Sequence, residues 1–155
     1  MNEKDDLSLQ LKTTISNGNL VSDKILNKIV SDKILSKSCN SGFILDGYPR
    51  TIDQMKYLNN FNNQNNININ FIINISVDIQ TIEERIISRS KLENRDDDSI
   101  DTIRTRIKNY IQETKPVSEF YSQNFHSIYY ELEGTDKVDE IQKKLIKIVK
   151  NANFS

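Results

Sequence analysis

Hydrophobic positions along the chain follow two different periods, and this predicts helices that alternate with strands. Short runs rich in β-branched or aromatic residues predict three strands, at residues 42–45, 69–77 and 128–132. The run at 69–77 is apolar on both faces, which is typical of the interior of a parallel sheet. Apolar residues at helical spacing predict helices over residues 7–15, 22–35, 51–58, 79–90, 99–114, 116–121 and 138–149.

Polar segments separate these elements. The Asn-rich stretch at residues 59–70 predicts a loop, and residues 90–98 predict a second loop that is highly charged. Strands that alternate with helices along one chain favour a parallel α/β sheet. The 155 residues suffice for one domain, which we expect to span residues 1–155.

Composition excludes several classes of function. A net charge of −1 gives no basic footprint for nucleic acid, and no apolar run reaches the ~18 residues of a membrane helix. The first residues are acidic and polar, unlike a secretory or transit signal. The single cysteine, Cys39, can form neither an intrachain disulfide nor a cysteine-built zinc site. We therefore expect a soluble, cytoplasmic monomer.

The segment at residues 42–51 is the most informative of the chain, and it reads GFILDGYPRT. A short apolar run ends in Asp-Gly and continues as Pro-Arg. This order predicts a buried strand that delivers the carboxylate of Asp46, a tight turn and the guanidinium of Arg50 to one edge of the sheet. Gln54 follows one turn into the next predicted helix.

Arginines supply the second pattern. Arg85 and Arg89 are spaced i, i+4, so they share one helix face. Arg95 lies in the charged loop and Arg106 on the helix after it. Any one arginine, taken alone, is most often a solvated surface residue. As a set with Arg50 they predict a cleft for several phosphates, because the guanidinium fork matches phosphate geometry and keeps its charge.

These two patterns together resemble the adenylate kinase family of short-lid type. The chain carries Asp-Gly-Tyr-Pro-Arg, then Arg-x-x-x-Arg and Arg-x-Asp-Asp, then Tyr-x-x-x-Thr-x-Pro, in the family's order. The resemblance extends over residues 7–149. It implies a three-layer α/β/α parallel sheet of the P-loop nucleoside monophosphate kinase type. It also implies a remnant of the monophosphate-binding region at residues 1–21 and a minimal lid at residues 90–94.

The resemblance implies an AMP side of the site. Arg50 would hold the α-phosphate, and Gln54 would read the adenine edge, which offers a donor beside an acceptor. Residues 19–21 would close over the base. The full set implied on this side is Asn19, Leu20, Val21, Gly47, Tyr48, Pro49, Arg50, Gln54, Arg95 and Arg106.

It also implies an ATP side and a catalytic set. Asp46 would orient water bound to Mg²⁺, the expected cofactor, with no direct protein ligand to the metal and no zinc. The residues implied on the ATP side are Arg85, Arg89 and Asp136. The implied catalytic residues are Arg50, Arg89, Arg95, Arg106 and Asp46.

The implied reaction transfers the γ-phosphoryl group of ATP to AMP and gives two ADP. One motif departs from the family, because no Gly-x-x-x-x-Gly-Lys loop occurs anywhere in the sequence. We therefore expect the central first strand and the P-loop to be missing, so that residues 42–45 and 69–77 either pair directly or belong to a longer polypeptide.

Three explanations of this departure remain open. The sequence is an incomplete reading of its gene, a decayed relative with little activity, or a protein that binds nucleotide without catalysis or takes its front part from another chain. In each case this chain alone is expected to be inactive or weak. A UMP/CMP kinase is less favoured, because Gln54 suits adenine.

Overall fold

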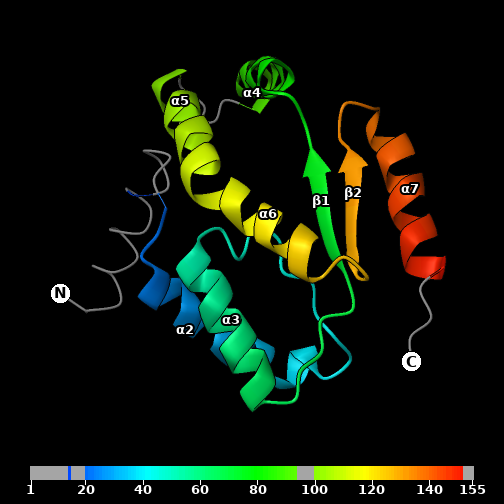
Figure 1. Ribbon diagram of the computed structural model, residues 1–155. Helices are drawn as coiled ribbons and strands as arrows, with labels where there is room; N and C mark the ends of the chain where they lie inside the picture. Colours follow the sequence, from blue (N-terminus) through cyan, green and yellow to red (C-terminus); the bar gives the residue numbers. More distant parts are fainter. Residues whose placement is uncertain (1–13, 15–19, 94–99, 152–155) are drawn as a thin grey trace.

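The computed structural model describes residues 14, 20–93 and 100–151. In this part of the chain, helices alternate with two strands (Figure 1), and no helix is long and apolar enough to cross a membrane. In chain order the elements are α2 (Asp23–Ile34), η1 (Lys37–Cys39), α3 (Ile52–Gln64), β1 (Ile72–Ser76), α4 (Ile79–Glu93), α5 (Ile100–Asn109), η2 (Tyr110–Thr114), α6 (Lys115–Asn124), β2 (Tyr129–Glu133) and α7 (Val138–Asn151).

The sheet consists of β1 and β2, which run parallel with Ile72 opposite Tyr129 and Ser76 opposite Glu133. Because side chains alternate along a strand, Ile72 and Tyr129 point to one face and their neighbours to the other. The first face carries the core, in which Met55, Val117 and Tyr121 are buried. Partly buried residues pack around these three, namely Ile52, Ile72, Phe120, Phe125 and Tyr129.

The opposite face of the sheet is covered by α7. Tyr130 and Leu132 of β2 line a hollow of about 310 Å³ together with Lys144, Lys147 and Ile148 of that helix. Helices α3 and α6 therefore lie on one face of the sheet and α7 on the other, as the ribbon indicates (Figure 1). The predicted three-layer α/β/α order and the parallel sheet are confirmed.

The predicted strand at residues 42–45 is wrong. These residues form no ladder with β1 or β2, Gly42 has a φ of 117°, and the side chain of Ile44 is 94% exposed. Extended residues become a strand only where a neighbour pairs with their backbone, and here none of the described residues does so. Asp46 therefore follows no strand of the sheet.

The other edge of β1, which faces away from β2, is not paired with any strand among the described residues. Ile72 donates to Ile128, and Ser76 accepts from Gly134, so alternate residues of β1 serve β2. The backbone groups of Ile73 and Ile75 point the other way by the two-residue period, and no described residue bonds them. The direct pairing of 42–45 with β1 that the sequence left open does not occur.

The predicted loop at residues 59–70 is too long, because α3 continues six residues beyond 58, to Gln64. Asn62 is buried, and Asn59 donates to the sulfur of Met55 (3.2 Å) and accepts from the hydroxyl of Tyr121 (3.5 Å). The bond from Tyr121 of α6 is a tertiary contact, and together with the local contact to Met55 it offsets the low helix propensity of asparagine. The Asn-rich composition was a poor guide here, since propensity is the weaker effect.

The two helices predicted at 99–114 and 116–121 form one continuous rod (Figure 1), with η2 as a π-helical turn between α5 and α6. The backbone N–H of Lys115 donates to the carbonyl of Tyr110, five residues earlier. Pro116 follows directly. A wider turn at this point accommodates a residue that lacks an N–H and would crowd an ordinary α-helical carbonyl.

Truncation of the buried core residue Met55 tests this packing. Met55 is 2% exposed, so Met55→Ala should lower the free energy of unfolding by about 2 to 5 kcal/mol, measured by urea denaturation. Ile44→Ala is the matched control, because Ile44 is 94% exposed and its loss should change stability by less than about 0.5 kcal/mol. Equal effects of the two substitutions would contradict the described core.

Candidate functional site

Residues 46–54, called the 46–54 corner below, connect the irregular segment after η1 to the first turn of α3. Thr51 ends the turn and caps α3, because its hydroxyl accepts the backbone N–H of Gln54 (3.1 Å). Asp53 lies in the first helical turn, where a negative charge is favourable. Threonine at this position therefore explains why the helix begins where it does.

A polar stripe on α2 holds the corner in place. Asp23, Asn27 and Ser31 are spaced i, i+4, i+8 and so share one helix face. Asn27 accepts from the Tyr48 hydroxyl (2.6 Å), and Ser31 bonds the Tyr57 hydroxyl on α3 (2.8 Å). The third member, Asp23, bonds two residues at the start of α3, as described next.

Gln54 is fully buried, with 0% of its surface exposed. Its Nε2 donates to Asp23 Oδ1 (2.7 Å), and its Oε1 accepts from the backbone N–H of Arg50 (2.7 Å). The second carboxylate oxygen of Asp23 accepts from the Thr51 hydroxyl (2.8 Å). Asp23 therefore joins the cap and the amide of α3 to α2, a contact that only the fold creates.

Arg50 lies folded back over its own turn. Its Nε donates to the carbonyl of Gly47 (2.8 Å), and its own carbonyl accepts from the Thr114 hydroxyl (3.1 Å) of η2. Gly47 has a φ of 70°, and a Cβ there would lie 2.6 Å from Arg50 Nη2. Only glycine allows both this backbone conformation and the close approach of the guanidinium. The turn thus presents an exposed cation in a fixed place.

Asp46 stands at the start of the corner with an exposed side chain. In the described part of the chain, no three His, Cys, Asp or Glu side chains lie close enough together to hold a metal ion.

A second group of predicted residues gathers at the carboxyl end of β2. Arg85 of α4 donates from Nη1 to the Gly134 carbonyl (2.6 Å) and from Nη2 to the Thr135 carbonyl (3.0 Å). A Cβ at Gly134 would lie 2.6 Å from Val77 Cγ2 and 2.7 Å from Ile75 Cγ2. Arg85 and this close-packed glycine hold the loop after β2 against α4 and β1.

Asp136 follows in the same loop and faces α7. Its carboxylate accepts from Lys144 Nζ at 2.6 Å. This hydrogen bond and the charge of Asp136 raise the pKa of Lys144 above its usual value. Both side chains are well exposed, so the pair contributes little to stability.

The remaining predicted residues are distributed along the chain. Leu20 and Val21 immediately precede α2 and are partly exposed. Arg106 lies on α5, partly buried, roughly 12 Å along the rod from Thr114, which contacts the corner. Asn19 and Arg95 lie outside the described residues, as does the side chain of Arg89.

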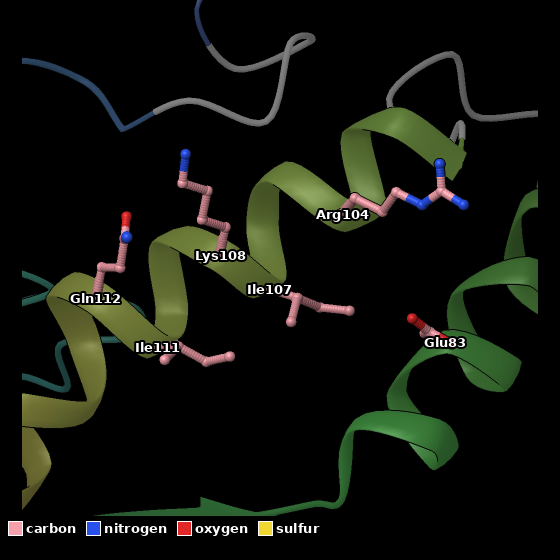
Figure 2. Close-up of a pocket in the computed structure, with 6 residues that line it drawn as sticks. All are labelled: Glu83, Arg104, Ile107, Lys108, Ile111 and Gln112. Carbon is pink, nitrogen blue, oxygen red and sulfur yellow. The ribbon is translucent and has the colours of Figure 1, made fainter.

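Two hollows in the described part of the chain are not lined by any predicted site residue. One is the hollow beneath α7. The other, of about 320 Å³, lies between α4 and the rod; Figure 2 shows Ile107 and Ile111 directed toward Glu83 on α4. Its lining residues are Glu83, Arg104, Ile107, Lys108, Ile111 and Gln112.

The expected cleft lined jointly by the arginines is therefore not one of these hollows. The corner contacts Thr114 of η2, whereas Arg85 contacts the loop after β2. Residues 42–45 form no strand that would join the corner to the edge where β1 and β2 end. In parallel sheets that shared edge is what gathers ligand-binding side chains.

Asp23 was not among the predicted site residues, although it lies within the helix predicted over residues 22–35. The available signal was the recurrence of Asp23, Asn27 and Ser31 on one face of a helix whose other positions, Asp32 apart, are apolar or lysine. A polar stripe of this kind indicates a helix that packs against polar groups rather than against solvent.

Two tyrosines near the corner have perturbed acidity. Burial raises the pKa of Tyr48 to about 12, and the neighbouring Tyr57 and Asp23 add to the shift. Burial also raises the pKa of Tyr121 to about 12. Both hydroxyls are therefore protonated at neutral pH, and Tyr48 acts as a hydrogen-bond donor to Asn27 rather than as a base.

Comparisons with known proteins give one consistent result. The family model for adenylate kinase matches residues 1–126. The chain is 29% identical to the adenylate kinase of Thermotoga neapolitana over 95% of this chain and 78% of that protein. It is 32% identical to that of Leifsonia xyli over 92% and 70%. It is 33% identical to that of Xylella fastidiosa over 90% and 74%.

The raised pKa of Tyr48 predicts a pH dependence of stability. Its ordinary value is 10.0 and its folded value about 12, so the folded state retains a proton that the unfolded chain loses. The free energy of unfolding should stay constant with respect to this group below about pH 10 and fall between about pH 10 and 12. Chemical denaturation across this range measures the slope.

Tyr48→Phe should make that slope shallower and, at neutral pH, cost about 1 kcal/mol for the hydrogen bond to Asn27. Tyr110→Phe serves as the control, because Tyr110 is 41% exposed. Identical slopes in the two variants would show that Tyr48 is not buried as described.

Proposed function

Because this chain belongs to the adenylate kinase family, we propose that it serves the nucleoside monophosphate kinase reaction, in which ATP and AMP give two ADP. Within this reaction the chain supplies the acceptor side, which binds AMP. The observation that carries the proposal is the 46–54 corner, where Arg50 is fixed by Gly47 and by the start of α3.

The phosphate of AMP would lie on Arg50. The guanidinium is exposed and uses Nε for the Gly47 carbonyl, so both Nη atoms remain to face two phosphate oxygens. Since the turn already holds the side chain, little side-chain entropy is lost on binding. Arg106 and Arg95 would contact the transferred phosphoryl group from the rod and the lid.

The base of AMP would be read by Gln54. One Nε2 hydrogen and one Oε1 lone pair are engaged by Asp23 and Arg50, which leaves one donor and one acceptor on the same amide. That pair matches the donor and acceptor of adenine. Because Gln54 is fully buried, the base can reach it only after the residues that cover it move, and Asn19, Leu20 and Val21 would then close over the base.

ATP would be met by the second group. Arg85 organises the loop of residues 134–136, whose backbone would lie along the adenine, with Asp136 at its end. Arg89, one helical turn after Arg85, would hold the donor phosphates. Asp46 would orient water bound to Mg²⁺, and this ion, when bound, neutralises charge on the phosphates as the phosphoryl group moves.

A second candidate is AMP binding without catalysis. The observation that favours it is the lack of any Gly-x-x-x-x-Gly-Lys in the sequence, since that loop supplies the backbone N–H groups that cradle donor phosphates. We therefore expect AMP to bind to this chain, while turnover by this chain alone is weak or nil.

Coupled measurement of ADP separates the two candidates. The purified chain is incubated with ATP, AMP and Mg²⁺, and ADP is quantified against buffer, with AMP affinity determined in parallel by calorimetry. ADP that forms only when both nucleotides are present supports the kinase. AMP binding without ADP supports the second candidate, and a chain that neither binds nor turns over AMP contradicts both.

Arg50→Ala tests the acceptor role. The affinity for AMP should fall by about 10- to 100-fold, as expected for loss of charge-assisted bonds worth about 1.5 to 3 kcal/mol, while the affinity for adenosine stays the same. Arg104→Ala removes the same charge from an exposed site on α5 and should leave both affinities unchanged. Equal loss for AMP and adenosine would exclude a phosphate contact by Arg50.

A further inference from the structure

Asp23, the first residue of α2, contacts the 46–54 corner, and the proposed reaction assigns it no role. Its Oδ1 accepts from Gln54 Nε2 at 2.7 Å, and its Oδ2 accepts from Thr51 Oγ1 at 2.8 Å. Both partners are far from it in sequence, so the contact is a property of the fold. Asp23 itself is half-buried, which strengthens these charge-assisted bonds relative to exposed ones.

We propose that Asp23 is a positioning residue that fixes the orientation of the Gln54 amide and thereby sets the preference of the corner for an adenine-type base. The proposal rests on the proposed function, because it assigns to Gln54 the reading of the base. It adds that the selectivity of Gln54 comes from α2 and not from the glutamine alone.

The chemistry of the partners leaves the amide one orientation. A carboxylate can only accept a hydrogen bond, and the backbone N–H of Arg50 can only donate one. With Nε2 toward Asp23 and Oε1 toward Arg50, both contacts are satisfied. The reversed amide would place an oxygen against the carboxylate and an NH₂ group against the N–H. Both bonds would then be lost in a buried place.

The same carboxylate also orients Thr51. Because the hydroxyl donates to Asp23 Oδ2, its lone pairs remain to accept the backbone N–H of Gln54 at 3.1 Å. The cap, the amide and the Arg50 backbone are thus linked through one anion. Asp23 therefore controls where α3 starts as well as which way its first buried side chain faces.

A Gln54 amide held in one orientation distinguishes adenine from uracil. The free donor and the free acceptor of Gln54 occupy defined positions, so a base must present its acceptor and its amino donor in the matching order, as adenine does. Uracil offers a carbonyl oxygen and a ring N–H instead, with donor and acceptor exchanged. An amide free to rotate by half a turn would accept either order, and the preference would be lost.

Asp23→Asn is the central test. The asparagine retains one oxygen acceptor and replaces the other by an NH₂ group, so it can no longer accept from both Gln54 Nε2 and Thr51 Oγ1, and its hold on the Gln54 amide is weakened. We expect the affinity for AMP to fall about tenfold, the effect of one hydrogen bond, and the ratio of AMP to UMP affinity to approach one.

Asp53→Asn is the matched control. Asp53 is an exposed carboxylate in the same first turn of α3, and its loss removes the same charge from the same region. This variant should retain both the affinity for AMP and the ratio of AMP to UMP. Equal affinities and equal ratios in the two variants would overturn the proposal.

Hydrogen exchange, measured without nucleotide, tests this inference independently of the proposed function. The side-chain amide of Gln54, assigned by its loss in Gln54→Leu, should be protected from hydrogen exchange in the wild type and in Asp53→Asn. It should lose that protection in Asp23→Asn. Retained protection overturns the positioning role. A wild-type chain that binds no nucleotide overturns the proposed function and the selectivity assigned here. Hydrogen exchange of the Gln54 amide would still test the contact between Asp23 and Gln54 in that case.

A second pair of variants guards against a general loss of folding. Gln54→Glu places two carboxylates together and should lower the melting temperature, whereas the double variant Asp23→Asn with Gln54→Glu restores a donor opposite an acceptor and should recover it. Recovery supports the Asp23–Gln54 contact. A double variant no more stable than Gln54→Glu alone shows that the two side chains do not interact, and the proposal fails.

Discussion

The polar seam between α2 and the 46–54 corner is the constraint on which the candidate site depends. Three side chains of one helix face bind the corner and α3, and at its centre the Asp23 carboxylate holds both Thr51 and Gln54. Buried polar groups are costly unless they are paired, so this seam is satisfied in one arrangement only. The position of Arg50, and hence of any phosphate it binds, follows from that arrangement.

The sheet places a second constraint on the molecule. Only β2 pairs with β1, and the backbone groups of Ile73 and Ile75 on its other edge have no partner among the described residues. The side chains of β1 are those of an interior strand, with no charge between 71 and 77 to protect an exposed edge. Among the described residues, no third strand therefore joins the corner to the sheet beside the Arg85 loop.

Arg50 and Arg85 have different roles in the structure, although both are arginines. Arg50 is exposed, and only its Nε is bound within the turn, so most of its guanidinium faces outward. Arg85 donates from both Nη atoms to carbonyls of the loop after β2, so in this state it organises backbone rather than facing a ligand. A shared family pattern of arginines therefore includes residues that contribute through protein structure as well as charge.

The amino-acid sequence by itself determined the family, the order of most elements and the identity of the corner, because these follow from local motifs and from the period of apolar residues. It correctly predicted α2, β1, β2 and α7 and the three layers. It failed at residues 42–45 and 59–64, where the outcome depends on whether a distant partner is present. A strand needs a neighbour, and the Asn-rich end of α3 has a distant partner in Tyr121 of α6, which bonds Asn59.

Only the tertiary structure decided how the site residues are held. No local pattern states that Asp23 will meet Gln54, since the two are 31 positions apart and meet through the packing of α2 on α3. Nor could spacing alone show that Arg85 would be engaged by the carbonyls of Gly134 and Thr135. Side-chain type is a property of the sequence, whereas the partner of a side chain depends on long-range geometry, and that partner sets its role.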